Sequence, residues 1–120
     1  MPWNLDSDRP IFLQIVEHLQ YEIVSGYYGP GQRLPSVRDL AAEASVNPNT
    51  MQRALSELER DGYMHSERTS GRFITEDKGK IGELKKQLAT AQIEVFLQAM
   101  KKLGLSNEEI QVLVKENMKE

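Results

Sequence analysis

Four polar side chains in the middle of the chain, Asn49, Gln52, Arg53 and Ser56, recur at spacings of three and four residues. Residues so spaced lie on one face of a helix. Asn and Gln amides can pair bidentately with adenine, and an Arg guanidinium can grip O6 and N7 of guanine. No residue from Ala44 to Ser56 carries a carboxylate that would repel an anion. These residues therefore predict a helix face that can contact base edges, with readout by Asn49, Gln52 and Arg53.

A helix running from Pro48 to about Asp61 would position this face. Asn47 is a preferred N-cap residue, and Pro48 suits the first helical position because its missing N–H would have had no intrahelical partner. Gly62 is a natural left-handed residue to end it. The opposite face carries an apolar stripe of Met51, Ala54, Leu55 and Leu58. The capping role alone can explain Asn47, so a cap and a phosphate contact both remain open for it.

Two more helices and a hairpin are predicted around this helix. Pro10 opens a helical pattern that ends near Gly26. Ser36 and Asp39 have the spacing of a capping box, which predicts a short second helix and a tight corner before Asn47. After the third helix, the β-prone runs YMHSER and RFIT flank a polar tip. The order helix, helix, helix, hairpin is that of a winged helix-turn-helix.

Composition limits the classes of function. A chain of 120 residues has room for one modest domain and an appendage, and it contains no cysteine. His18 and His65 have no companions at metal-ligand spacing, so we expect no metal site and no cofactor. The N-terminal residues do not resemble a signal peptide, and no apolar run has the length of a membrane span. We therefore expect a cytoplasmic protein without a membrane partner.

Charge is unevenly distributed along the chain. The formal net charge is −3, and every cation in residues 1–76 is an arginine, whereas the eight lysines lie in residues 77–120. Arginine presents a planar fork that suits phosphate and guanine better than the compact lysine ammonium does. An arginine-only first part, with its carboxylate-free stretch, favours contact with an anionic partner at that stretch.

The last part of the chain predicts a helical tail. Residues 77–83 are Gly-containing and predict a linker between a domain at 1–76 and a two-helix tail at 84–120. The apolar residues of the tail predict a dimerisation surface made of Leu84, Leu88, Ala91, Val95, Phe96, Met100, Leu103, Ile110, Leu113 and Val114. Ser106 and Glu109 form a second capping-box pair before the last helix. Apolar space near this tail could also admit a small-molecule effector, although packing explains the same residues.

The segment LPSVRDLAAEASVNPNTMQRALSELERDGYMH, followed by SGRFIT, resembles the DNA-binding domain of the GntR family of bacterial transcription regulators. The short tail after VNPNT resembles the YtrA-like subfamily, whose members dimerise through it. The resemblance implies a mainly α fold with a small β-hairpin, namely a winged helix-turn-helix domain followed by a short helical dimerisation tail. It also implies double-stranded DNA as the partner.

Carried over by position, the resemblance implies that Arg38 contacts the DNA backbone or a base, although Asp39 and Asp61 offer it salt bridges. The helix that enters the major groove would contribute Asn47, Asn49, Thr50, Gln52 and Arg53. The wing would contribute Ser70, Gly71 and Arg72. Here Thr69 and Arg72 depart from the usual G-x-G-T wing, and Arg72 could add a phosphate contact. Pro48 stands where some relatives carry a contacting arginine.

These observations predict a sequence-specific transcriptional regulator that binds a pseudo-palindromic operator as a homodimer. A repressor is expected rather than an activator. The alternative is a winged-helix module for protein interaction whose tail engages a protein partner, which the overall acidity favours. An enzyme is not expected, because the sequence has no nucleophile elbow, phosphate loop or paired-carboxylate arrangement.

Overall fold

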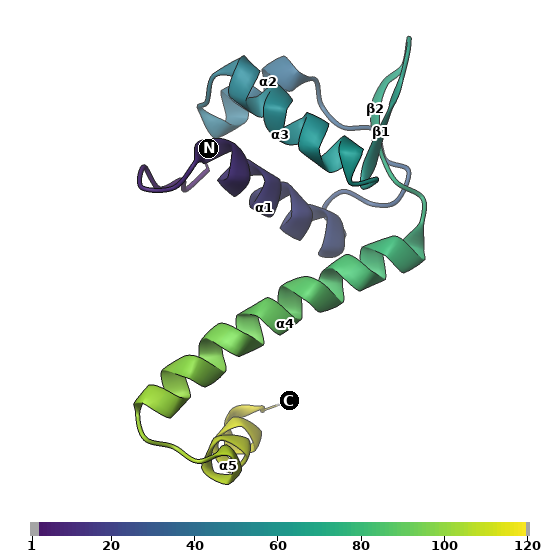
Figure 1. Ribbon diagram of the computed structural model, residues 1–120. Helices are drawn as coiled ribbons and strands as arrows, with labels where there is room; N and C mark the ends of the chain where they lie inside the picture. Colours follow the sequence, from purple (N-terminus) through teal and green to yellow (C-terminus); the bar gives the residue numbers. More distant parts are fainter. Residues whose placement is uncertain (1–2, 120) are drawn as a thin grey trace. The chain divides into compact units, whose positions relative to one another are not determined.

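The computed structural model describes residues 3–119, which form five helices and one two-stranded hairpin (Figure 1). The elements in chain order are α1 (Ile11–Val24), α2 (Val37–Ala44), α3 (Pro48–Arg60), β1 (Met64–Glu67), β2 (Gly71–Ile74), α4 (Lys78–Lys102) and α5 (Asn107–Asn117). The mainly α fold with a small hairpin is confirmed. The chain divides into two compact units, the first ending at Lys85 and the second beginning at Lys86.

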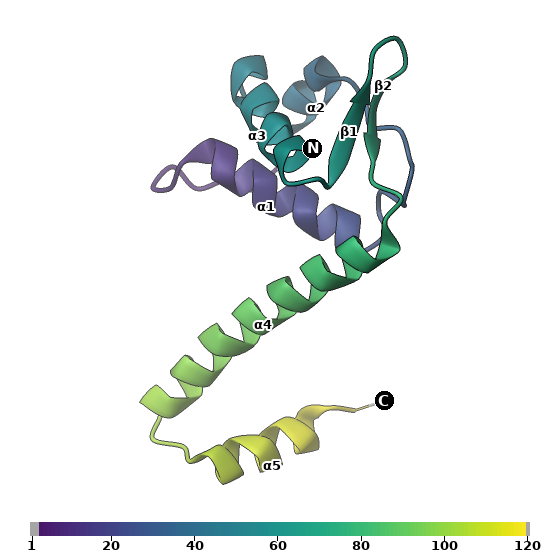
Figure 2. The same ribbon diagram turned by 45° about the vertical axis from the view of Figure 1, so that its right-hand side comes forward.

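The core of the first unit forms where the apolar stripes of its helices meet. α1 and α2 both pack against α3, and the hairpin follows α3 directly (Figure 2). The largest side chains that are fully buried are Ile15, Leu19, Ile23, Leu40, Met51, Leu55, Leu58 and Ile74. The predicted stripe of α3 is buried, so its opposite face is presented to solvent.

The corner between α2 and α3 is made by a residue in the left-handed conformation. Ser45 has φ 60°, which non-glycine residues rarely adopt. The N–H of Ser45 donates to the carbonyl of Ala42 at 3.2 Å, and that of Val46 donates to the carbonyl of Ala41 at 3.0 Å. These bonds end α2 and turn the chain into α3 within a few residues.

The hairpin is extended by the loop that precedes α2. β1 and β2 are antiparallel, with Met64 opposite Ile74 and Glu67 opposite Gly71. Arg33 forms an isolated antiparallel bridge with Phe73, and the Leu34 N–H donates to the Arg72 carbonyl at 2.9 Å. The loop therefore runs along β2, which brings Arg33 beside the hairpin.

The predicted linker at 77–83 is helical in this structure apart from its first residue. α4 begins at Lys78, and the Asp77 carboxylate accepts from the backbone N–H of Lys80 at 3.0 Å. This bond satisfies a donor at the helix start and so stabilises the first turn of α4. The division into domains that was based on this linker stays a prediction.

The second unit contains the rest of α4 and α5. The predicted capping box is confirmed: the Glu109 N–H donates to Ser106 Oγ at 3.2 Å, and the Ser106 N–H donates to Glu109 Oε1 at 2.8 Å. No helix within residues 3–119 is long and apolar enough to cross a membrane.

A polar cluster joins the N-terminal segment to α1 and α2. The Trp3 ring stacks on His18 with centroids 3.7 Å apart, and Trp3 Nε1 donates to Glu43 Oε2 at 3.1 Å. His18 Nε2 lies 3.3 Å from Glu22 Oε2. Within the described part of the chain, Glu22 Oε1 is buried with no hydrogen-bond partner. Burial raises the pKa of Glu22, against the opposing charge and hydrogen bond of His18 and with the help of nearby Glu43.

Candidate nucleic-acid interface

The start of α3 is capped as predicted. Asn47 has an extended backbone conformation, and its Oδ1 accepts from the N–H of Asn49 at 2.7 Å. Pro48 occupies the first helical turn. The Asn47 side chain is thus committed to one orientation, and it remains exposed beside the positive end of the helix dipole. An anion is favoured at such a helix end.

The outward face of α3 is open and carries no carboxylate in its first two turns. Asn49, Gln52 and Ser56 are exposed, and Gln52 Nε2 donates to Ser56 Oγ at 3.1 Å. Gln52 can exchange this surface partner for a base edge at little cost, and the exposed amide of Asn49 is equally open to one. The structure therefore brings these predicted residues together on one surface.

Arg53 is exposed, but its side chain is not free in space. The guanidinium carbon lies 3.6 Å from the centroid of the Phe12 ring in the first turn of α1. A cation over an aromatic face at this distance is an attractive contact. Sequence reasoning placed Arg53 on the outward face without assigning it a partner.

Arg38 and Thr50 lie on either side of the corner between α2 and α3. Arg38 is exposed in the first turn of α2. Among residues 3–119 it makes no ion pair, not even with Asp39 or Asp61, the partners that the sequence offered. Thr50 is half-buried and lines an open hollow together with Trp3 and Asn47. Arg38 is thus available for an anion, whereas Thr50 presents only part of its surface.

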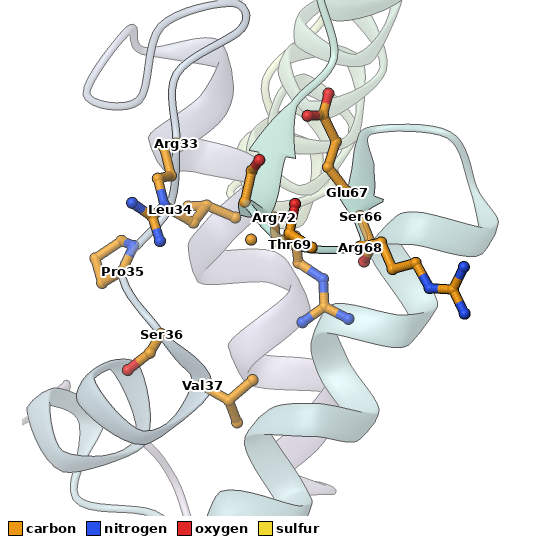
Figure 3. Close-up of a pocket in the computed structure, with 12 residues that line it drawn as sticks. Arg33, Leu34, Pro35, Ser36, Val37, Ser66, Glu67, Arg68, Thr69 and Arg72 are labelled. Atoms are coloured by element: carbon orange, nitrogen blue, oxygen red, sulfur yellow. The ribbon is translucent and has the colours of Figure 1, made fainter.

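The tip of the hairpin borders a groove next to α2. The groove has a volume of about 390 Å³ and is lined by residues 33–37 and 66–72 (Figure 3). Arg33, Arg68 and Arg72 are all at its edge. The N–H of Ser70 donates to the Glu67 carbonyl at 3.2 Å, which closes the turn.

Gly71 follows this turn with φ +112°, and a Cβ there would lie 3.0 Å from Arg33 Nε. A side chain at position 71 would therefore be strained and would displace that arginine.

Arg72 is held by α3. Its Nε donates to Glu59 Oε1 at 3.1 Å, and Ser66 Oγ donates to the same oxygen at 2.9 Å. Partial burial raises the pKa of Glu59, but the hydrogen bonds from Ser66 and Arg72 and the charge of Arg72 outweigh it, so the pKa is lowered overall. A phosphate contact by Arg72, which stays a prediction, has to compete with this ion pair.

Arg33 was missed by the sequence reasoning. Its place beside Gly71 depends on the bridge to Phe73, which joins residues far apart in the chain. Only its arginine character, shared with every cation of residues 1–76, could have pointed to it. Arg33 and Arg68 are both exposed and both line the groove.

The residues predicted for dimerisation divide into two groups. Leu84 and Ile110 are only 2% and 3% exposed, so they are covered within the chain itself and have no surface to offer a partner. Val95 and Leu103 are 69% and 71% exposed. In the second unit an apolar hollow of about 390 Å³ is lined by Phe96, Met100, Ile110, Leu113, Val114, Asn117 and Met118. The open apolar surface is therefore mainly that of the second unit.

Comparison with known proteins agrees with this geometry. Residues 12–74 match the family described as "Bacterial regulatory proteins, gntR family". The chain is 44% identical over 107 residues to the uncharacterized HTH-type transcriptional regulator YhcF of Bacillus subtilis, covering 89% of this chain and 88% of YhcF. It is 39% identical over 88 residues to the HTH-type transcriptional repressor YtrA of the same organism, covering 68% of each.

Solved structures extend the match. A GntR family transcriptional regulator from Listeria monocytogenes superposes with a TM-score of 0.85 at 42% identity, covering 93% of this chain and 98% of that one. The AraR DNA-binding domain in complex with operator ORE1 superposes with a TM-score of 0.54 at 25% identity, covering 62% of this chain and 94% of that one. These relatives are DNA-binding transcriptional regulators and not enzymes. The chain belongs to the GntR family of bacterial regulatory proteins, among its YtrA-like members.

Proposed function

We propose that this DNA-binding regulator is a sequence-specific repressor that binds a pseudo-palindromic operator as a homodimer. The observation that carries the proposal is the open face of α3, which presents Asn49 and Gln52 beside a capped helix start and carries no carboxylate in its first two turns. Amides at these positions can read adenine in the major groove.

Exposed arginines of the first unit also support the proposal. Arg38 lies at the start of α2, and Arg33 and Arg68 lie at the hairpin groove. Such groups fix the register of a protein on the duplex by contacting phosphate, while base edges supply the sequence preference. Repression is proposed because YtrA carries that description.

The homodimer is proposed from the second unit. Val95, Leu103 and Val112 leave more than half of their surface exposed, which is costly in water for large apolar side chains. A second copy would cover them and would present two α3 helices to half-sites about one helical turn apart. Leu84 and Ile110 are left out of this interface because they are already buried.

Selection of bound sequences from random DNA, followed by anisotropy titrations, tests the proposal. We expect the selected duplex to be a pseudo-palindrome and to bind at least about 1,000-fold more tightly than a scrambled duplex at physiological salt. Affinity should fall steeply as salt rises. Equal binding of the two duplexes at moderate salt would refute sequence specificity.

A protein-interaction module is the second candidate, because the tail presents apolar surface and the chain is acidic overall. Arg53→Ala separates the candidates, because Arg53 is exposed and lies outside the core. Weaker DNA binding with an unchanged oligomeric state supports the repressor. Unchanged DNA binding by this variant, together with a tail that binds a protein partner, supports the module.

A further inference from the structure

The contact between Arg53 and Phe12 joins the helix-turn-helix to a residue outside it. The guanidinium carbon is 3.6 Å from the ring centroid, while Phe12 is half-buried against the core and Arg53 is exposed. At this distance the cation lies over the face of the ring. The guanidinium is therefore held in place by a rigid ring while its donors remain available to a ligand.

The contact also sets the side of α3 on which Arg53 acts. Successive residues of a helix are rotated by about 100°. Gln52 and Glu59 are seven residues apart and lie on the same side, and Glu59 bonds to Ser66 and Arg72 of the hairpin. Arg53 is turned away from that side and rests on α1. α1 and the hairpin thus flank α3 on different sides (Figure 2).

A helix in the major groove meets two kinds of group. Base edges form the floor of the groove, and the phosphates of the two strands form its walls. A side chain that leans toward a flank of the helix faces a wall, and a side chain between the flanks faces the floor. Because Arg53 is held against α1, its guanidinium faces the phosphates on one side of the groove.

We propose that Phe12 holds Arg53 as a phosphate clamp on the α1 side of α3, which leaves base reading to Asn49, since helix geometry places Asn49 between Gln52 and Arg53. Phe12 is a positioning residue in this scheme and does not itself touch DNA. The ligand of the clamp is a backbone phosphate of double-stranded DNA. The inference rests on the proposed DNA binding and gives Arg53 a different role from the base contact that its sequence position suggested.

Titrations of the full-length protein with the selected and a scrambled duplex test the clamp. Arg53→Ala should weaken both duplexes by the same factor, on the order of tenfold per subunit. It should also reduce the slope of log affinity against log salt by about one per subunit. Phe12→Leu should weaken both duplexes about two- to fivefold, because the charge remains but is no longer held.

Three further variants control for packing and for charge. Phe12→Tyr keeps the aromatic face and should bind as the parent protein does. Tyr63→Leu removes a ring beyond the end of α3, whose centroid lies 5.0 Å from Lys80 Nζ, and should leave both affinities unchanged. Arg53→Lys keeps the charge without the planar fork, so its affinity should lie between those of the parent and of Arg53→Ala.

The outcomes separate this inference from the proposed function. If Arg53→Ala weakens only the selected duplex, Arg53 reads a base and the clamp is wrong. If Phe12→Leu binds as tightly as the parent, or more tightly, Phe12 does not position Arg53 for binding. If the parent itself does not distinguish the duplexes, sequence specificity fails, while an equal loss for both duplexes in Arg53→Ala would still support the clamp.

Discussion

The two roles proposed for Asn47, as helix cap and as neighbour of a DNA phosphate, can be tested separately by substitution. Its Oδ1 accepts one hydrogen bond of 2.7 Å from the Asn49 N–H. Replacing an N-cap Asn by Ala costs about 1 kcal/mol of stability, within a range of about 0.5–2 kcal/mol. For a unit of the size of the first one, which ends at Lys85, 1 kcal/mol lowers Tm by about 4–8 °C. We therefore expect Asn47→Ala to melt about 4–8 °C below the parent.

Asn47→Asp should give the opposite pattern. Aspartate caps as well as asparagine does, and its charge favours the helix N-terminus, so Tm should be unchanged or raised. If a phosphate approaches this helix end, the new charge repels it. At about 7 Å and an effective dielectric constant of about 40, the repulsion is about 1.2 kcal/mol, or roughly sevenfold in affinity per subunit.

Thermal melts followed by circular dichroism measure the first effect, and anisotropy titrations at low salt measure the second. Asn47→Ser is the matched control, since serine keeps a cap without a charge. If Asn47→Ala melts at the same temperature as Asn47→Ser, the cap contributes nothing. If Asn47→Asp binds DNA as tightly as the parent, no phosphate lies near this end of α3.

Three further outcomes are expected. Glu59→Gln should loosen the hairpin, which would be seen as faster amide exchange in β1 and β2. It should also make stability fall less in acid. The reason is that the lowered pKa of Glu59 in the folded state gives stability above the usual carboxyl pKa, and this stability disappears as the pH falls through the folded pKa. Leu103→Glu should make the protein monomeric in sedimentation experiments, because it places a charge on a side chain that is 71% exposed and proposed to be covered by a second copy. Glu22→Gln should stabilise the fold at neutral pH, as measured by denaturant titrations. Burial raises the pKa of Glu22, so its ionisation weakens the folded state of the parent. The gain in stability should vanish below the usual Glu pKa, where Glu22 of the parent is protonated as well.

Each of these outcomes has a control on the same chain. Glu17→Gln removes a carboxylate whose ion pair with Arg9 is half-exposed, so stability should change by less than about 0.5 kcal/mol. Gln111→Glu adds a charge at an exposed polar position of α5 and should leave the oligomeric state unchanged. An unchanged oligomer in Leu103→Glu, unaltered exchange in Glu59→Gln, or a destabilised Glu22→Gln would each contradict its argument.

Periodicity and capping chemistry alone predicted most of the local structure. The apolar stripe of α3, its cap at Asn47 and the capping box of Ser106 are as the sequence predicts, because each depends on residues within one or two helical turns. Residues 77–83 were interpreted as a linker from their glycines, whereas residues 78–83 belong to α4 in the structure. Glycine lowers helix propensity by only about 1 kcal/mol per residue, which a capped start and packing can outweigh.

Contacts between distant residues were beyond the sequence. Nothing in the spacing of residues indicates that Arg33 lies beside Gly71, that Glu59 holds Arg72, or that Arg53 rests on an aromatic ring. Burial likewise removed Leu84 and Ile110 from the proposed dimer surface, although their spacing matched that of exposed neighbours. A stripe shows that a helix face is apolar, but the same stripe serves a core and an interface.

By itself the sequence determined the family, the order of helices and hairpin, and the helix whose face can read DNA, because these follow from local periodicity, capping and a motif of fixed spacing. Only the tertiary structure decided what each arginine of the first unit touches. A guanidinium at the end of a long side chain can reach several partners, and which partner it meets is set by the packing of α1, α3 and the hairpin. In that packing Arg53 lies on the ring of Phe12 and Arg72 bonds to Glu59. Arg38 makes no ion pair among the described residues.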